Sequence, residues 1–198
     1  MEQVDVRTIA RVDINVVIQN IKNLFDTYRK DAGFIDTATI VPYKPTSDFG
    51  KTISNGPVIT YRLVRRKPGA VSGKPYSGTS WKVPRTIEIE RDILGIEGEQ
   101  TDLMYYDNTL EFMVFSTDAS IRDSTAMTFE DFMQLVRGAF RRLGICDIYM
   151  TERLSDDAEN IDGTQAFYSV LQYYVRTSKT YSSNVGLIKE ILTRTEII

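Results

Sequence analysis

The sequence predicts an α+β domain in which a mixed or mainly antiparallel sheet is flanked by two helices and carries a long projecting loop. Two segments repeat apolar residues at helical spacing, and five alternate them at the spacing of a strand. Their order is helix, three strands, helix, two strands, which is typical of helices packed on an antiparallel sheet. The 198 residues, 42% of them hydrophobic and 26% charged, fit a single domain over 1–198, with an extended arm at 184–198.

Two amphipathic segments predict the helices. The first runs over 13–31, with Asp13 as its N-cap and Gly33 as its stop. The second runs over 128–143, where Thr128 and Asp131 form a weak capping box and Gly144 follows as the C-cap. The segment 32–56 between the first helix and the next strand is rich in Pro, Gly, Thr and Ser. It is expected to be mainly loop, with a short strand at 39–41.

Alternating residues predict the strands, which are expected at 57–66, 85–93, 109–117, 146–153 and 165–177. Residues 67–84 contain three prolines and three glycines, which predicts a long loop without regular structure. An acidic turn at 95–108 should separate two antiparallel strands. A second acidic loop is expected at 155–163.

The composition argues against the commonest kinds of catalysis. The chain has no histidine and one cysteine, so it cannot form a Ser-His-Asp or Cys-His nucleophile, a His-ligated metal site or an intramolecular disulfide. Cys146, beside Ile145, is expected to be a small core residue. We expect no catalytic residue, no cofactor and no metal, although a hydrolase based on carboxylates stays open as an alternative.

Two sequence motifs partly match ligand-binding sites, a phosphate-binding loop and a calcium site, but lack features that such sites require. The segments around Lys51 and Lys74 lack the glycine, hydroxyl and helix spacing of a phosphate-binding loop. The acidic loop 155–163 does not have the ligand spacing of an EF-hand, which favours a solvated loop over a calcium site. The longest apolar runs are far shorter than the ~20 residues that span a bilayer, and the N-terminus lacks a signal-peptide pattern. A soluble, cytoplasmic protein is therefore expected.

Charge is distributed unevenly along the chain. From Phe49 to Ile87 there are eight basic residues and no acidic one, whereas from Glu88 to Asp123 there are ten acidic residues against Arg91 and Arg122. The basic segment 49–87, with its interleaved aromatic residues, could bind nucleic acid. Alternatively, the basic segment of one subunit meets the acidic segment of its neighbour, because complementary patches on different faces produce head-to-tail rings.

The layout of residues 57–178 resembles tail terminator, or tail-completion, proteins of long-tailed bacteriophages. The resemblance is carried by Asp107-Asn108 leading into Leu110–Ser116, by the amphipathic Phe129–Met133, by Phe140–Gly144 and by Tyr174–Thr177. The Gly- and Pro-rich stretch after Arg65-Arg66-Lys67-Pro68-Gly69 also resembles phage neck and tail proteins.

The resemblance implies a non-enzymatic virion protein that is assembled in the host cytoplasm and forms a ring, commonly a hexamer. Such a ring caps the tail tube, ends its polymerisation and joins the tail to the neck. Its expected partners are further copies of itself, the tail tube protein, neck or connector proteins and, in some particles, the tail sheath. DNA would pass through the lumen without sequence-specific binding. A head-to-tail connector is the alternative within this class.

The residues expected to make these contacts come from the basic stretch, the long loop and the acidic turn. The basic contacts are electrostatic, and Trp81 would be an apolar anchor. The set is Arg65, Arg66, Lys67, Lys74, Trp81, Lys82, Glu97, Glu99 and Asp102.

Overall fold

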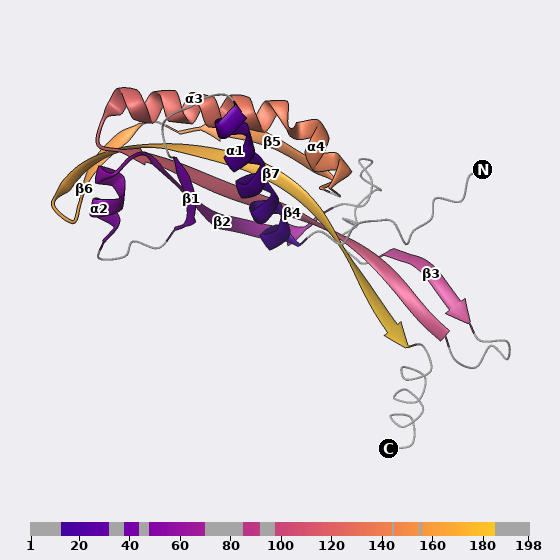
Figure 1. The fold of residues 1–198 in the computed structure, drawn as a ribbon. Helices are drawn as coiled ribbons and strands as arrows, with labels where there is room; N and C mark the ends of the chain where they lie inside the picture. The colour runs from indigo at the N-terminus through magenta and orange to yellow at the C-terminus, as the bar shows by residue number, and fades with distance from the viewer. Residues whose placement is uncertain are drawn as a thin grey trace, which may run out of the picture.

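The computed structural model describes seven stretches of the chain and confirms the α+β class (Figure 1). The described residues are 13–31, 38–43, 48–69, 85–91, 98–143, 145–154 and 156–184. The helices among them are α1 (Ile14–Asp31), α2 (Phe49–Ser54), α3 (Ala119–Leu135) and α4 (Arg137–Arg142). The strands are β1 (Thr39–Pro42), β2 (Val58–Pro68), β3 (Arg85–Arg91), β4 (Gly98–Ser116), β5 (Asp147–Arg153), β6 (Asp157–Ile161) and β7 (Thr164–Asn184).

All seven strands belong to one mixed sheet. The order across it is β1-β2-β4-β7-β5, while β3 pairs with β4 and β6 pairs with β7 beyond the ends of the neighbouring strands. Among the strands of the described residues, only β1 and β2 are parallel, and the other pairs are antiparallel. The predicted mixed, mainly antiparallel sheet is therefore confirmed.

The two central strands are much longer than their alternation predicts. β4 begins at Gly98 instead of 109, and β7 runs on to Asn184 instead of 177. The expected acidic turn at 95–108 is therefore wrong from Gly98 onward, because these residues are held as a strand by β3 on one side and β7 on the other. With β3, the ends of β4 and β7 form a three-stranded ribbon that projects beyond the helices (Figure 1).

The helical prediction is right for α1 and wrong for the start and continuity of the second helix. Asp13 precedes α1 and accepts a hydrogen bond from the Asn15 amide at 3.4 Å. Instead of beginning at Thr128, α3 begins after Asp118, whose carboxylate caps the amides of Ser120 and Ile121 at 2.7 and 3.1 Å. The predicted C-terminal part of that helix is a separate short helix, α4.

Two further elements lie in segments that we expected to be loops. Helix α2 lies within 32–56, and strand β6 lies within the acidic loop 155–163. The β6–β7 hairpin closes through Asp162 and Gly163, which both have positive φ (49° and 80°), as the two central residues of a type I′ turn require. The predicted loop 67–84 begins later than expected, because β2 extends to Pro68; residues 70–84 and 185–198 lie outside the described part of the chain.

Successive residues of β4 face two separate hydrophobic clusters. Leu110, Phe112 and Val114 pack with α1 and α3 on one face, in a cluster that contains the aromatic side chains of both helices. Met113 and Phe115 pack with α2 on the other face. In the larger cluster, the Phe129 ring lies 5.4 Å from that of Phe25 and 4.9 Å from that of Phe112, centroid to centroid. Helix α1, helix α3 and the sheet thus meet around one phenylalanine.

We predict that Phe129→Ala lowers the free energy of unfolding by about 3 to 5 kcal/mol, because it opens a cavity where three elements meet. Urea unfolding followed by circular dichroism measures this. The matched control is Leu135→Ala in the same helix; since Leu135 is 70% exposed, its change should stay within about 0.5 kcal/mol. Equal losses for the two variants would contradict the assigned packing.

Candidate assembly interface

The outer half of β2 is an open strand edge rich in basic residues. β1 pairs only with Val58–Tyr61, and no other strand of the described residues pairs with that side of Arg62–Pro68. All side chains from Arg62 to Lys67 are exposed, including the apolar Leu63 and Val64 at 41% and 49%. We call Arg62–Pro68 the basic edge.

A β-bulge at Val64 decides which way these side chains point. On either side of it, Arg62 pairs with Glu111, Arg65 with Thr109 and Lys67 with Asp107. Because paired residues share a face, the three basic side chains lie on the face that carries Met113 and Phe115. We call this the α2 face. Arg66 lies on the opposite face, with its guanidinium 4.2 Å from the centre of the Tyr106 ring.

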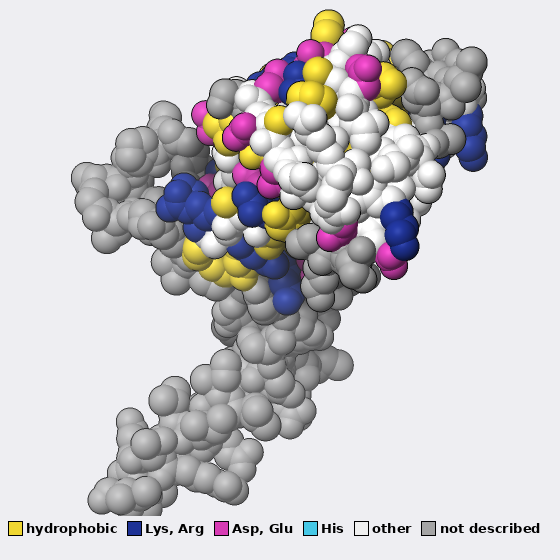
Figure 2. Space-filling model, turned by 90° about the vertical axis from the view of Figure 1, so that its left-hand side faces the viewer, with side chains coloured by type: hydrophobic (Ala, Val, Ile, Leu, Met, Phe, Trp, Pro, Cys, Tyr) yellow, Lys and Arg dark blue, Asp and Glu magenta, His cyan; other side chains and the backbone are white. Residues whose placement is uncertain are grey.

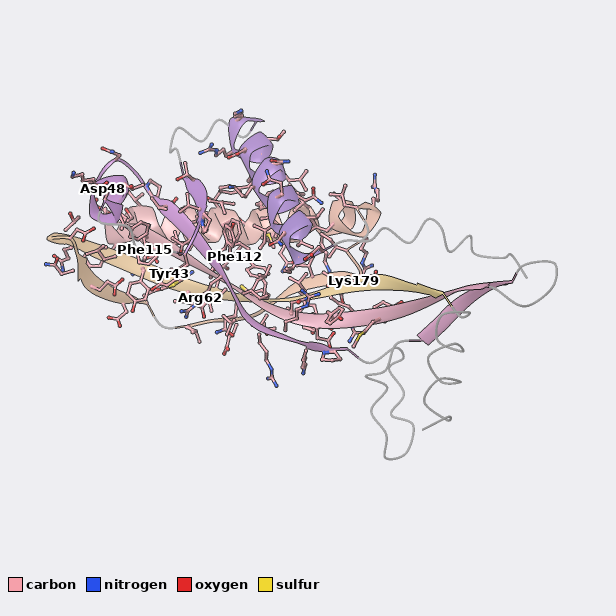
Figure 3. The ribbon with its side chains drawn as sticks, turned by 90° about the horizontal axis from the view of Figure 1, so that it is seen from below. Tyr43, Asp48, Arg62, Phe112, Phe115 and Lys179 are labelled. Atoms are coloured by element: carbon pink, nitrogen blue, oxygen red, sulfur yellow. The ribbon has the colours of Figure 1, made fainter. Side chains whose placement is uncertain are left out.

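Part of the charge asymmetry is neutralised within a single chain. Arg62 forms a salt bridge with the buried Glu111 at 2.5 Å and also lies 5.2 Å from the Tyr43 ring (Figure 3). The basic and acidic segments, which we expected to meet between subunits, are therefore neighbours in one sheet along β2 and β4. Arg65 and Lys67 form no ion pair with the described residues. Figure 2 shows basic and hydrophobic side chains gathered at the lower left of the described surface, with acidic side chains above them and also at the lower right.

Asp107, next to the basic edge, is held by two partners on β7. Arg176 donates to its carboxylate from Nε at 2.8 Å, and the Tyr174 hydroxyl donates to the same oxygen. Burial raises the pKa of Asp107, but the hydrogen bonds from Arg176 and Tyr174 and the positive charge of Arg176 outweigh it, so the pKa lies below its usual value. Desolvation, and then the hydrogen bond to Asp107 and its negative charge, raise the pKa of Tyr174, although Arg176 acts in the opposite direction. Gly69 lies against this carboxylate, where a Cβ would come within 2.8 Å of the Asp107 Oδ1.

A polar hollow extends from this cluster across β7 to β5. Its lining comprises Tyr105, Cys146, Asp147, Tyr149, Tyr174 and Arg176. Cys146 is exposed here, so the expectation that it is a core residue is wrong: it precedes β5 on the sheet edge, outside both hydrophobic clusters. Partial desolvation nevertheless raises the pKa of its thiol, which favours the unreactive protonated form.

The opposite side of the sheet is an acidic edge formed by β5 and β6. Both strands pair with the same side of β7, one after the other, and neither has a second strand partner among the described residues. Glu152, Asp157 and Glu159 are exposed along this line. They pair with Gln172, Tyr168 and Ala166, which places all three on the α2 face. We call Asp147–Ile161 the acidic edge.

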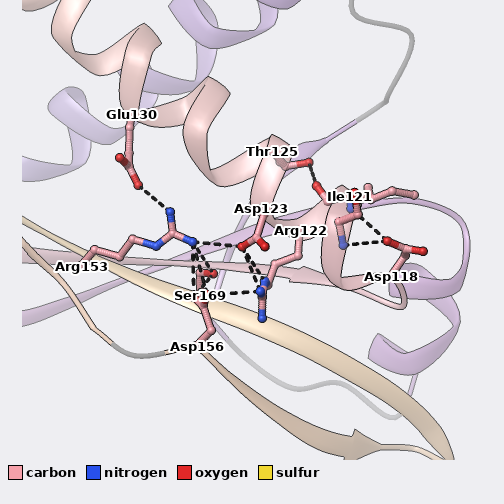
Figure 4. A network of polar contacts seen from close by, with 10 residues as sticks. Asp118, Ile121, Arg122, Asp123, Thr125, Glu130, Arg153, Asp156 and Ser169 are labelled. Carbon is pink, nitrogen blue, oxygen red and sulfur yellow. Dashed lines mark hydrogen bonds and ion pairs between the residues drawn. The ribbon is translucent and has the colours of Figure 1, made fainter.

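A network of ion pairs fixes the bend between β5 and β6 (Figure 4). Arg153, the last residue of β5, contacts Asp123 at 3.1 Å and Glu130 at 3.4 Å, both on α3, and Asp156 at 3.4 Å. The largely buried Arg122 reaches Asp156 at 3.2 Å. Burial raises the pKa of Asp156, but the hydrogen bond from Ser169 and the charges of both arginines outweigh this effect. The pKa of Asp156 therefore lies below its usual value. The network neutralises the charge of Asp156. The negative charge that the acidic edge presents to solvent therefore comes from its exposed residues Glu152, Asp157 and Glu159.

The structure brings together only part of the predicted contact set. Arg65, Arg66 and Lys67 lie on the basic edge, and Glu99 and Asp102 lie on β4 within the ribbon, where they pair with Glu90 and Thr86 of β3. Lys74, Trp81, Lys82 and Glu97 lie outside the described residues. The acidic edge was missed, although the Asp162-Gly163 dipeptide is a recognised hairpin signal.

Neither protein-family models nor curated proteins yield a match to this chain. Within the described residues, no helix is both long and apolar enough to cross a membrane. The same residues contain no group of three or more acidic or cysteine side chains placed to hold a metal ion.

We predict that Asp107→Asn lowers the free energy of unfolding by about 1.5 to 3 kcal/mol at pH 7, the range for hydrogen bonds to charged groups. The pKa of Asp107 is depressed in the folded state, so its contribution is fully present above the unfolded pKa of about 3.9 and is lost as the pH falls through the lower folded value. Urea unfolding at pH 7 and near pH 2.5 should therefore show the difference from the wild type shrinking in acid.

The control is Asp131→Asn, on the exposed side of α3, which should change stability at pH 7 by less than about 0.5 kcal/mol. A difference between wild type and Asp107→Asn that stays constant from pH 7 to pH 2.5 would contradict the assignment.

Proposed function

We propose that this protein is a structural component of a bacteriophage tail, a terminator that assembles as a ring, caps the tail tube and joins it to the neck. The observation that carries the proposal is the basic edge: an exposed strand edge with Arg65 and Lys67 free of ion pairs among the described residues. An open edge of this kind tends to pair with another chain. An assembly protein uses that tendency, whereas a monomer must block it.

Two features beside the basic edge support the proposal. The segments that carry the resemblance form the centre of the fold, since Leu110–Ser116 lies in β4 and Tyr174–Thr177 in β7. The three-stranded ribbon extends beyond the helices and the hydrophobic core of the subunit, which makes its strands accessible to a neighbouring subunit (Figure 1).

Binding of nucleic acid by the basic segment is less well supported. Stacking of bases needs open aromatic faces. Near the basic edge, however, the arginines of the chain itself lie over the rings of Tyr43 and Tyr106, at 5.2 and 4.2 Å. The exposed charge could still neutralise phosphates, so DNA in the lumen of a ring is compatible with this surface.

The ring is tested by the mass and shape of the purified protein. A hexamer of the 22.6 kDa chain has a mass of about 136 kDa, and its closed cyclic symmetry should appear as a ring with a central hole in negative-stain images. Added to the polymerising tail tube protein encoded with it, the protein should shorten the tubes by blocking one end. A monomer that leaves tube length unchanged would contradict the proposal.

We further predict that Arg65→Glu/Arg66→Glu/Lys67→Glu breaks the ring into smaller species, because it reverses the charge of the basic edge on both faces. Light scattering coupled to size exclusion measures the mass, and circular dichroism checks that the fold is kept. An unchanged mass would show that the ring does not use this edge.

A further inference from the structure

We propose that the acidic edge of one copy of this chain pairs with the basic edge of a second copy, so that their sheets join into one. This inference rests on the proposed ring and identifies the surface that holds it together. In the register that sets Asp157 and Glu159 beside Lys67 and Arg65, β6 would lie beside Arg62–Pro68 of the next subunit.

The two edges are placed for a head-to-tail contact. β2 lies beyond β4 on one side of the sheet, and β5 and β6 lie beyond β7 on the other. A contact between such different surfaces leaves one open edge of each kind on every dimer, so further copies can add, and the chain of subunits closes into a ring where the rotation between neighbours divides a full turn. A contact between two identical edges would stop at a dimer.

Strand directions make the proposed junction antiparallel. β2 and β7 both run opposite to β4, and β5 and β6 run opposite to β7. When two copies continue one sheet with the same orientation, β2 of one therefore meets β5 and β6 of the other in opposite directions. Both edges carry backbone N–H and C=O groups that face away from their own sheet, which is the requirement for adding a strand.

The charges of the two edges fall on the same face. Arg65 and Lys67 share the α2 face with Thr109 and Asp107, and Asp157 and Glu159 share it with Tyr168 and Ala166. β4 and β7 pair from Glu99 to Ser116 without a register shift, so the face is continuous across them. Residues two apart on a strand are spaced by ~6.8 Å, so two basic side chains would stand beside two acidic ones at equal spacing.

The same charges disfavour the competing contacts. Two basic edges side by side would place arginine and lysine against their copies, and two acidic edges would oppose aspartate and glutamate. Like charges directly across a strand pair are destabilising, whereas opposite charges stabilise it. The edges thus select the one arrangement that can close a ring.

Charge reversal on each edge tests the pairing. We expect Arg65→Glu/Lys67→Glu and Asp157→Lys/Glu159→Lys each to raise the concentration at which the ring dissociates at least tenfold, measured by mass photometry or sedimentation. The quadruple variant, in which the opposite charges have exchanged edges, should return to within about threefold of the wild type. The control Lys30→Glu/Arg142→Glu reverses two exposed basic charges on α1 and α4 and should keep the ring.

Mixing the two double variants tests the head-to-tail geometry. Each keeps one native edge and carries one charge-reversed edge, so an equimolar mixture forms native and charge-exchanged junctions in alternation and should restore rings that contain both variants, with a mass of about 136 kDa for a hexamer of the 22.6 kDa chain. Each variant alone should stay monomeric at that concentration. Unfolding curves for every variant show whether a lost ring reflects a lost fold.

The outcomes separate this inference from the proposed function. A wild type that is monomeric at every concentration overturns the ring itself. A wild-type ring that survives both double variants overturns the pairing of these edges and leaves the ring standing. Failure of the folded quadruple variant to assemble, or a mixture that forms no rings, also overturns the pairing.

Discussion

The fold depends on the unbroken antiparallel pairing of β4 with β7, from Glu99 beside Asn184 to Ser116 beside Phe167. This pair forms the middle of the sheet, and every other strand except β1 hydrogen-bonds to one of the two. Because the register does not shift, the two faces stay distinct along its whole length. A slip by one residue would exchange the residues of the two hydrophobic clusters and move Glu111 among the aromatic rings of α1 and α3.

This central pair also fixes the surface chemistry of the molecule. By setting the faces, it puts Arg65, Lys67, Asp157 and Glu159 on one side of the sheet, although they come from strands at opposite edges. The bulge at Val64 also determines which face of the sheet carries the basic side chains that follow it. Without it, Arg65 and Lys67 would turn toward the other face, where Arg66 now packs on Tyr106.

Ion pairs among the described residues mainly fix the positions of secondary-structure elements relative to one another. The salt bridge between Arg62 and the buried Glu111 lies on the sheet, and the contacts of Arg153 join β5, β6 and α3. Most of these groups are half-exposed, so each pair contributes little free energy alone, and a network holds geometry better than an isolated pair does. The exposed charges of the two open edges that take no part in these ion pairs are the ones that another chain would contact under the proposed pairing.

The sequence by itself determined the α+β class, helix α1, and the existence of β1, β2, β3 and β5, because their periodicity and caps act within a few residues. It also located Arg65, Arg66 and Lys67 as surface charges. Only the tertiary structure decided that Gly98–Asn108 is strand, since hydrogen bonds from both neighbours hold residues that show no alternation. Likewise, the start of α3 at Asp118 depends on the cap and on Arg122, whose charge is tolerated in a buried position by Asp123 and Asp156. Which face of the sheet carries the charges of the two edges depends on the pairing register of strands that are far apart in the sequence. No local sequence pattern predicts that register.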